Sequence, residues 1–318
     1  MLSEPVGTIN IFKGRNFLTL LDYSKTEIEQ LIMLGLDIKK KKKNNILYQP
    51  LKGKTLGMIF EKASTRTRVS FEVGMFQLGG HALYLNNNDL QLKRGETMAD
   101  TAKVLSRYVD GILLRTNDQD KLIELAKNST VPVINGLSDL YHPTQAIADM
   151  MTVYEEKGKW EGIKLTYVGD GNNVAHSLMI VGAKLGINVV VACPKGYEPN
   201  EQIYDKAKKL ANEHGAQLEV TSDVEKAVQQ ADVIYTDVWA SMGQEEENQI
   251  RLKKFEGYQI NQRLAKMAKK DYIFMHCLPA HREEEVTAEV IDGPNSVVFD
   301  EAENRLHAHK AILTALMT

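Results

Sequence analysis

The stretch Ala63-Ser64-Thr65-Arg66-Thr67-Arg68-Val69-Ser70-Phe71 follows an apolar, strand-like run at 55–60 and opens a helical pattern that continues to residue 78. Ser64 is a residue type that caps helix N-termini. The first N–H groups of a helix have no partner within it, and the positive end of the helix dipole lies beside them. The hydroxyls of this stretch and the guanidinium of Arg66 add further donors. The stretch therefore predicts an anion-binding turn, or more simply a capped helix with surface arginines.

Strand and helix patterns alternate on both sides of this stretch. In the first half, the expected strands are 55–60, 81–85, 111–115 and 131–135, and the expected helices are 27–40, 66–78, 98–108, 118–127 and 144–157. Ser24 is a candidate N-cap for the first of these helices. In the second half, the expected strands are 164–169, 189–192, 217–221, 233–236 and 272–275, with helices between them, then a short strand-like run at 297–299 and a last helix at 305–317. Such alternation is typical of parallel sheets and predicts two α/β halves that meet near residue 150.

Polar residues stand where six of the expected strands end. In open parallel sheets, ligands bind beyond the carboxyl ends of the strands. The residues at these ends are Ser64 to Thr67, Arg115, His142 to Gln145, Asn172 with Asn173, Asp237, and His276 with Cys277. Six such placements favour a ligand-binding cleft between the two halves.

The composition is that of an ordinary globular chain, and its 318 residues favour two domains. A formal net charge of -3 gives no global argument for nucleic acid or a membrane surface as a partner. Two cysteines make no disulfide framework. Because the sequence also shows no signal peptide and no apolar run of about 20 residues, we expect a cytoplasmic protein.

The stretch Gly169-Asp170-Gly171-Asn172-Asn173-Val174 begins like a dinucleotide-binding fingerprint after a strand. Val174 stands at the third glycine position, and the next expected strand ends at Cys193-Pro194, where the fingerprint needs a ribose-binding carboxylate. The pattern is incomplete, which disfavours a nicotinamide dehydrogenase.

The sequence alone leaves several interpretations open for two candidate residues, His142 and Cys277. His142, which precedes a proline, is either held by backbone groups or donates to a ligand carbonyl, and Gln145 has the same capacity to donate. Cys277 is a structural thiol, a zinc ligand or a nucleophile. A zinc site usually needs several ligands at short spacing, and His276, Cys277 and His281 are too few to indicate one, so we expect no metal.

Taken together, six motifs resemble the carbamoyltransferase family, in that family's order and spacing and over nearly the whole chain. The motifs are Ser64-Thr65-Arg66-Thr67-Arg68, His142-Pro143-Thr144-Gln145, Gly169-Asp170-Gly171-Asn172-Asn173, Asp237-Val238-Trp239 with Ser241-Met242-Gly243, His276-Cys277-Leu278-Pro279 and Glu303-Asn304-Arg305. The first two motifs mark carbamoyltransferases in general. The Ser-Met-Gly and His-Cys-Leu-Pro motifs resemble the ornithine branch.

The resemblance implies an α/β fold with two domains of similar size, each a parallel sheet flanked by helices. A carbamoyl phosphate-binding domain would comprise residues 1–149 together with a returning C-terminal helix, 303–318, and an ornithine-binding domain would comprise 150–302. The resemblance also implies a homotrimer with active sites at subunit interfaces, and a reaction that needs no cofactor.

The implied reaction joins carbamoyl phosphate and L-ornithine into L-citrulline and phosphate. Positioned donors would meet the charge that grows on the carbonyl oxygen and on the leaving phosphate. The implied catalytic residues are Arg66, Arg115, His142, Asp237, Cys277 and Arg305. Carbamoyl phosphate would meet all of these except Asp237, and in addition Ser64, Thr65, Thr67, Gln91, Gln145 and Leu278, whereas L-ornithine would meet Asn173, Asp237, Ser241 and Met242.

Other functions stay open at this point. A transferase that uses putrescine, another amine or aspartate as acceptor belongs to the same family. A catalytically silent binding or regulatory protein belongs to a different class and is possible because a fold does not fix a function. Citrulline formation would separate the ornithine enzyme from the silent protein.

Overall fold

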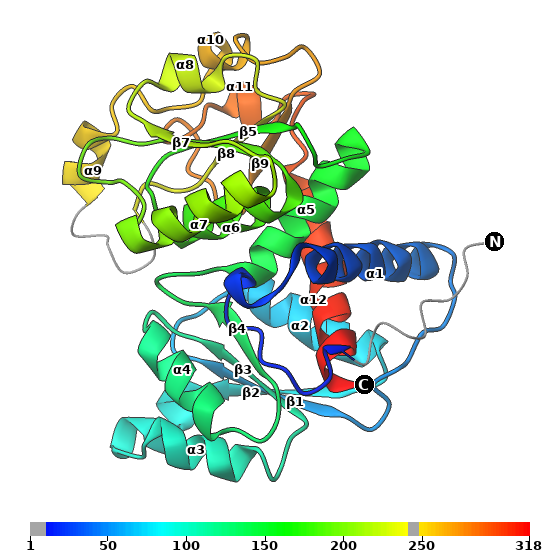
Figure 1. Ribbon diagram of the computed structural model, residues 1–318. Helices are drawn as coiled ribbons and strands as arrows, with labels where there is room; N and C mark the ends of the chain where they lie inside the picture. Colours follow the sequence, from blue (N-terminus) through cyan, green and yellow to red (C-terminus); the bar gives the residue numbers. More distant parts are fainter. Residues whose placement is uncertain (1–10, 241–247) are drawn as a thin grey trace. The chain divides into compact units, whose positions relative to one another are not determined.

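The computed structural model describes residues 11–240 and 248–318, and the chain divides into two compact units (Figure 1). Unit 1 comprises Met1–Ala148 and Asn304–Thr318, and unit 2 comprises Asp149–Glu303. The predicted domains, 1–149 with 303–318 and 150–302, differ from these units by one residue at each boundary. The assignment of one substrate to each domain stays a prediction.

Unit 1 contains a parallel sheet of four strands in the order β2-β1-β3-β4. Its strands are β1 (Thr55–Phe60), β2 (His81–Asn86), β3 (Gly111–Arg115) and β4 (Val133–Leu137). Its helices are α1 (Lys25–Lys43), α2 (Thr65–Gln77), α3 (Met98–Leu105) and α4 (Gln119–Asn128), joined by the N-terminal turns of α5 (Pro143–Lys157) and the C-terminal turns of α12 (Val298–Met317).

Helices cover both faces of this sheet, with α3 and α4 on one face and α2 with the C-terminal turns of α12 on the other (Figure 1). The core under α3 and α4 consists of buried residues from the sheet and both helices, among them Ile59, Ile112, Leu114, Met98, Ala102, Leu122 and Leu125. On the other face, Phe71 of α2 stacks on His309 of α12, with ring centroids 3.9 Å apart. Both faces of the sheet are therefore buried, as is usual for parallel strands.

Unit 2 contains a parallel sheet of five strands in the order β7-β6-β5-β8-β9. Its strands are β5 (Lys164–Val168), β6 (Asn188–Ala192), β7 (Leu218–Thr221), β8 (Val233–Thr236) and β9 (Ile273–His276). Its other helices are α6 (Asn173–Leu185), α7 (Glu201–Glu213), α8 (Val224–Val228), α9 (Asn248–Lys254), α10 (Gln262–Ala265) and α11 (Ala288–Ile291).

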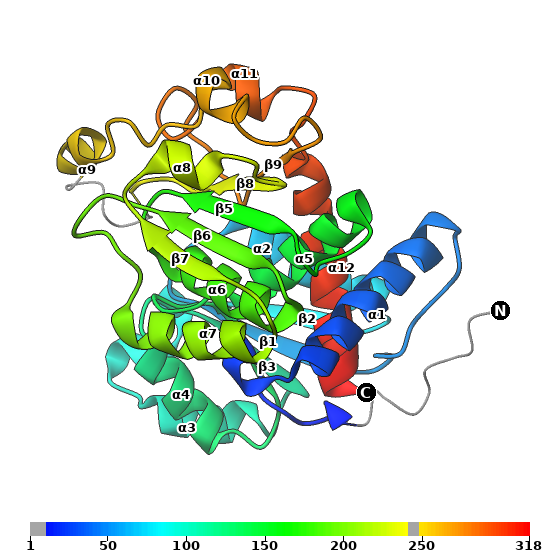
Figure 2. The ribbon, with the colours of Figure 1, turned by 45° about the horizontal axis from the view of Figure 1, so that its top comes forward.

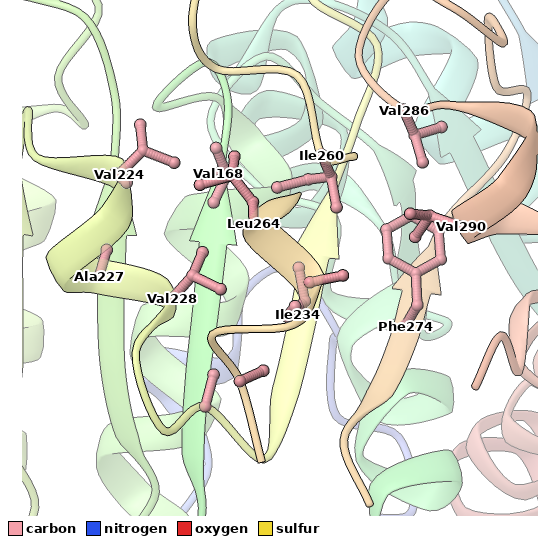
Figure 3. Packing of buried hydrophobic residues seen from close by; sticks show 14 of the residues in the cluster. Val168, Val224, Ala227, Val228, Ile234, Ile260, Leu264, Phe274, Val286 and Val290 are labelled. Atoms are coloured by element: carbon pink, nitrogen blue, oxygen red, sulfur yellow. The ribbon is translucent and has the colours of Figure 1, made fainter. Parts of the chain in front are cut away.

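The helices α6 and α7 lie on one face of this sheet (Figure 2), and α8, α10 and α11 lie on the other. Figure 3 shows the second interface, where Val168, Ile234 and Phe274 of the strands meet apolar residues of the covering helices and loops. Those partners are Val224, Val228, Ile260, Leu264, Val286 and Val290. This packing fixes the carboxyl ends of β5, β8 and β9, which carry the candidate site residues of unit 2.

The two parallel sheets confirm the predicted α/β class, and α12 returns the chain to unit 1 as expected. The strands predicted at 55–60, 111–115 and 233–236 have the observed bounds, whereas β4 begins two residues later than predicted. The strand-like run predicted at 297–299 is wrong, because α12 already begins at Val298. Asp300 and Glu301 in its first turn favour a helix start there, since acidic residues complement the positive end of the dipole.

No helix among the described residues has both the length and the apolar character that a membrane crossing requires.

Candidate active site

In each unit, the candidate residues gather where the strand order reverses. In unit 1 this point lies between β1 and β3, whose carboxyl ends lead to Ser64 and Arg115. In unit 2 it lies between β5 and β8, whose carboxyl ends lead to Asn172 and Asp237. Such a switch point is where open α/β sheets bind their ligands.

The turn after β1 has the predicted cap. Ser64 is extended, with φ -159° and ψ 108°, and its Oγ accepts a hydrogen bond from the Thr67 N–H at 3.3 Å. The same hydroxyl donates to Thr67 Oγ1 at 3.1 Å. Helix α2 therefore begins at Thr65, directly beyond the carboxyl end of β1, with the positive end of its dipole at the switch point.

Two buried arginines from other elements reach the start of α2. Arg115, the last residue of β3, directs Nη1 to Thr67 Oγ1 at 3.5 Å, and Arg305 of α12 donates from Nη2 to the same oxygen at 2.9 Å. Both side chains are nearly inaccessible, and Thr67 is fully buried. Two segments distant in sequence thus bring positive charge to one helix N-terminus, an arrangement that attracts an anion.

His142 and Gln145 lie at the start of α5 and are buried. Burial is the largest cause that holds the pKa of His142 well below its usual value, followed by the positive charges of Arg305, Arg115 and Arg66. The ring is therefore neutral near pH 7, and a neutral imidazole offers one N–H to a ligand oxygen. These charges place His142 within the same basic cluster as the arginines.

The other two candidates of unit 1 are more exposed. Thr65 is the first residue of α2 and is exposed. Gln91 is exposed in the 3-10 turn η4 (Gln91–Arg94), and no contact within the described part of the chain joins it to the basic cluster. Within unit 1, the structure therefore brings together the predicted residues except Gln91.

In unit 2, Asp237 lies at the centre of a hydrogen-bonded group at the ends of β5, β8 and β9. It is buried, and its Oδ2 accepts from Asn172 Nδ2 at 2.9 Å. Its Oδ1 accepts from the Val238 N–H at 2.8 Å and from the Cys277 thiol at 3.1 Å. A carboxylate has about four acceptor sites, so Asp237 keeps room for one more donor.

The sequence pattern predicts a direct role in substrate binding for Asn173 but none for Asn172. Asn172 caps α6, because its Oδ1 accepts from the N–H groups of Val174 and Ala175 at 2.9 and 3.2 Å. This cap fixes the side-chain amide so that its nitrogen faces Asp237. An asparagine at the N-cap position after a strand was the available signal. Asn173, the first residue of α6, lies beside it and is partly exposed.

The second glycine of the incomplete dinucleotide fingerprint, Gly171, has a local explanation. A Cβ atom on Gly171 would lie 2.3 Å from the backbone nitrogen of Pro199, and the Gly171 N–H donates to the Tyr197 carbonyl at 2.8 Å. Gly171 thus allows the chain to approach its own loop closely, which is a structural role independent of any nucleotide.

The segment after β9 has an unusual backbone conformation. Leu278 has φ +56°, a left-handed value that is uncommon for leucine. Its N–H donates to His276 Nδ1 at 2.9 Å, so the ring proton of His276 is on Nε2, which faces Glu285 Oε1 at 3.2 Å. Fully buried groups therefore hold residues 276–278 in the conformation that presents Cys277 and Leu278.

Asp237, His276 and Cys277 also offer ligand atoms that lie within 4.8 Å of one another. Each of these atoms already has a hydrogen-bond partner: Cys277 donates to Asp237, and the two ring nitrogens of His276 face the Leu278 N–H and Glu285. Burial is the largest cause that raises the pKa of Cys277 well above its usual value, followed by the negative charges of Asp237 and Glu301. The thiol is therefore protonated near pH 7, which suits a hydrogen-bond donor better than a nucleophile.

Ser241 and Met242, the other residues predicted for L-ornithine, lie outside the described residues. Nearby, Arg251 Nη1 donates to the Trp239 carbonyl at 2.8 Å and to Asp170 Oδ2 at 2.6 Å. Arg251 thereby links the segment after β5 to the segment after β8 within unit 2.

Two family profiles match the chain. The profile described as "Aspartate/ornithine carbamoyltransferase, carbamoyl-P binding domain" matches residues 15–155, and "Aspartate/ornithine carbamoyltransferase, Asp/Orn binding domain" matches residues 161–316.

Similar proteins agree with these profiles. The chain is 63% identical over 305 residues to "Ornithine carbamoyltransferase" of Oceanobacillus iheyensis, covering 96% of this chain and 95% of that protein. A solved structure of ornithine carbamoyltransferase from Pyrococcus furiosus is 60% identical, has a TM-score of 0.94 and covers 96% of this chain and 98% of that one. One from Gloeobacter violaceus is 44% identical, has a TM-score of 0.86 and covers 96% and 99%. Together with the switch-point geometry of both sheets, these matches show that the chain belongs to the aspartate/ornithine carbamoyltransferase family.

Proposed function

We propose that the chain is an ornithine carbamoyltransferase, which transfers the carbamoyl group of carbamoyl phosphate to the δ-amine of L-ornithine and releases L-citrulline and phosphate. The observation that carries this proposal is the basic cluster at the start of α2, where Arg115 and Arg305 meet at Thr67 Oγ1. Sequence matches of about 60% identity to proteins named ornithine carbamoyltransferase support the same reaction.

In unit 1, the basic cluster would bind carbamoyl phosphate. The N-terminus of α2 and Arg66 hold the phosphate, and Arg115 reaches both the phosphate and the carbamoyl group. His142, neutral because of its surroundings, and Arg305 donate to the carbonyl oxygen, and Gln145 holds the carbamoyl amide. Ser64, Thr65 and Thr67 contribute hydroxyl and backbone donors. These donors lie where charge grows as phosphate leaves, so no enzyme nucleophile is needed.

In unit 2, the group around Asp237 would bind L-ornithine. The remaining acceptor site of Asp237 receives the α-ammonium, and Asn173 and the Met242 N–H receive the α-carboxylate, with Ser241 as a neutral neighbour. The thiol of Cys277 and the backbone of Cys277 and Leu278 meet the carbamoyl amide or the attacking amine. The δ-amine must be neutral to attack, and its ordinary pKa is about 10.4.

We further propose a homotrimer in the cytoplasm that works in the biosynthetic direction. Gln91, exposed in η4, would serve the site of a neighbouring protomer, as the family resemblance implies. The biosynthetic direction is supported by two similar proteins whose names include "anabolic", one from Pyrococcus furiosus and one from Campylobacter jejuni.

An acceptor panel tests the proposed reaction. With carbamoyl phosphate, the purified protein should form citrulline from L-ornithine and should strongly disfavour putrescine, aspartate and acetylornithine. When a site is built to pair polar groups, a ligand that leaves those groups unpaired reacts with a kcat/KM lower by up to ~10⁴-fold. Turnover should rise as pH is raised above neutrality, because more δ-amine is neutral. Faster carbamoylation of putrescine would favour the alternative acceptor, and no product with any acceptor would favour a silent binding protein.

The protonated thiol of Cys277 leads to a second test. Iodoacetamide should label Cys277 slowly at pH 7 and faster as pH rises toward 10, because its pKa is raised by burial and by Asp237. Saturating L-norvaline, which carries the α-groups of ornithine but no δ-amine, should slow this labelling. Cys193 is the internal control, since it is buried and its pKa is raised to about 12. Peptide mass spectrometry measures both sites, and fast labelling of Cys277 at pH 7 would contradict a protonated thiol.

A further inference from the structure

Two acidic side chains that are not assigned to substrate are buried together in unit 2. Asp149 comes from α5 and Glu301 from the first turn of α12, and neither is exposed to solvent by more than 1%. Tyr235 of β8, also fully buried, directs its hydroxyl to Glu301 Oε1 at 3.1 Å and to Asp149 Oδ2 at 3.4 Å. Both carboxyl groups therefore face one hydroxyl group.

Hydrogen-bond chemistry favours a proton on this pair. An ionised carboxylate only accepts hydrogen bonds. The Tyr235 hydroxyl has one hydrogen and cannot donate to both carboxyl groups at once. The contacts are satisfied when one carboxyl group keeps its proton and donates it within the group of three.

The surroundings favour the same state. Burial is the largest cause that raises the pKa of Glu301 well above its usual value, and the charge of Asp149 adds to it, whereas the His276 N–H opposes it. The ionisable groups that face Tyr235 from β8 and from the segment after β9 are Asp237 and Cys277, which would add negative charge if ionised. Like charges at close range make the loss of the shared proton unfavourable.

Glu301 connects this pair to the candidate site. Its Oε2 accepts from the backbone N–H of His276 at 2.9 Å, at the end of β9. His276 in turn accepts from the Leu278 N–H, and the intervening Cys277 donates to Asp237. Glu301 therefore fixes the backbone at His276, and Asp149 and Tyr235 in turn fix Glu301.

We propose that Asp149 and Glu301 are positioning residues, which as a carboxyl pair with one shared proton fix the backbone at His276 and thereby aim Cys277 and Leu278 for carbamoyl transfer. The positioning role rests on the proposed function. The shared proton does not, because it is a property of the folded chain and is measured without substrate.

The decisive variant is Asp149→Asn, whose amide is a permanent donor to Glu301 and mimics the protonated carboxyl group. In the wild type, the folded pair keeps a proton that two carboxyl groups of an unfolded chain have lost above about pH 5.5. Unfolding therefore releases this proton. As pH rises, the pair increases the unfolding equilibrium constant by up to about tenfold per pH unit. Asp149→Asn has no such proton to release.

Urea unfolding at pH 6, 7, 8 and 9 measures the difference. The ratio of the wild-type unfolding constant to that of Asp149→Asn should rise up to about tenfold per pH unit, until the pair itself loses its proton. Glu289→Gln is the matched control, because it makes the same carboxyl-to-amide change at an exposed site of unit 2 and should follow the wild type. A ratio that stays constant between pH 6 and 9 would overturn the shared proton.

The positioning role is tested with Glu301→Leu and Glu301→Gln. The leucine variant removes the acceptor of the His276 N–H and should lower kcat at least tenfold, whereas the glutamine variant keeps an acceptor oxygen and should restore most of that loss. Circular dichroism reports whether each variant is folded. Folded Glu301→Leu with wild-type kcat would overturn the positioning role. If Glu301→Leu does not fold, kcat of Asp149→Asn is measured above pH 9 instead. As pH rises there, kcat of Asp149→Asn should fall less than kcat of the wild type, because the amide cannot lose its proton. Equal falls in kcat would overturn the positioning role.

If the wild type forms no citrulline, the proposed function fails while the unfolding measurement still decides whether the proton is shared.

Discussion

Arg66→Ala should lose about 30- to 5,000-fold in kcat/KM for carbamoyl phosphate while the protein stays folded. This range corresponds to the ~2–5 kcal/mol that truncation of a buried charged hydrogen bond costs. Much of the loss should appear in kcat, because the guanidinium meets charge that grows on the leaving phosphate. Steady-state kinetics at saturating L-ornithine measures the effect.

The ligand-free fold should tolerate this change. Within residues 11–240 and 248–318, Arg66 Nε is buried and has no hydrogen-bond partner, so its loss leaves no acceptor unsatisfied at that atom. Arg107→Ala is the matched control, since Arg107 is exposed just beyond α3 in the same unit. The control should stay within about threefold of the wild type. A folded Arg66→Ala protein with turnover as high as the control would contradict the phosphate-binding role.

Features fixed by local chemistry could be predicted from the sequence. The Ser64 cap, the start of α2 and the bounds of β1 depend on residues within one turn or one strand. The structure has the cap and the strand bounds as predicted, and α2 begins one residue earlier than predicted. The capping box of α1, in which Ser24 and Glu27 bond to each other's backbone, is a local feature of the same kind. Its Ser24 was likewise expected as the cap.

Features that depend on distant partners could not be predicted. Asp149, Tyr235 and Glu301 are separated by 86 and 66 positions, and each taken alone fits an ordinary helix or strand. The link from Asn172 to Asp237 crosses 65 positions and arises only because β5 and β8 are neighbours. A sequence shows the residue types but does not show which strand ends are adjacent.

The error at the start of α12 has the same origin. The run at 297–299 is β-branched and aromatic, and its intrinsic preference favours a strand. In the structure, Val298 is buried in the unit 2 core while Phe299 is exposed, a pattern set by the packing of the helix. Tertiary contacts therefore override the local propensity there.

Asp237→Asn should lower the preference for L-ornithine over 5-aminopentanoate by about 10- to 150-fold. The lost charge would recognise the α-ammonium, which ornithine carries and which 5-aminopentanoate lacks, although both amines have the carboxylate and the distal amine. A hydrogen bond to a charged group contributes about 1.5–3 kcal/mol, which gives this range. The measurement is kcat/KM for both amines in the wild type and the variant.

The ratio is the informative quantity because the variant also disturbs the fold locally. Asn172 is fixed by its cap on α6, so its amide nitrogen would face the new amide nitrogen at position 237 in place of Oδ2. That mismatch reduces the amount of active protein, but it scales kcat/KM for both amines equally and cancels in their ratio. Asp205→Asn, an exposed change on α7, is the control for handling and should keep the wild-type ratio. If Asp237→Asn also keeps that ratio, Asp237 supports the loop without recognising the α-ammonium, and the acceptor specificity must come from other residues.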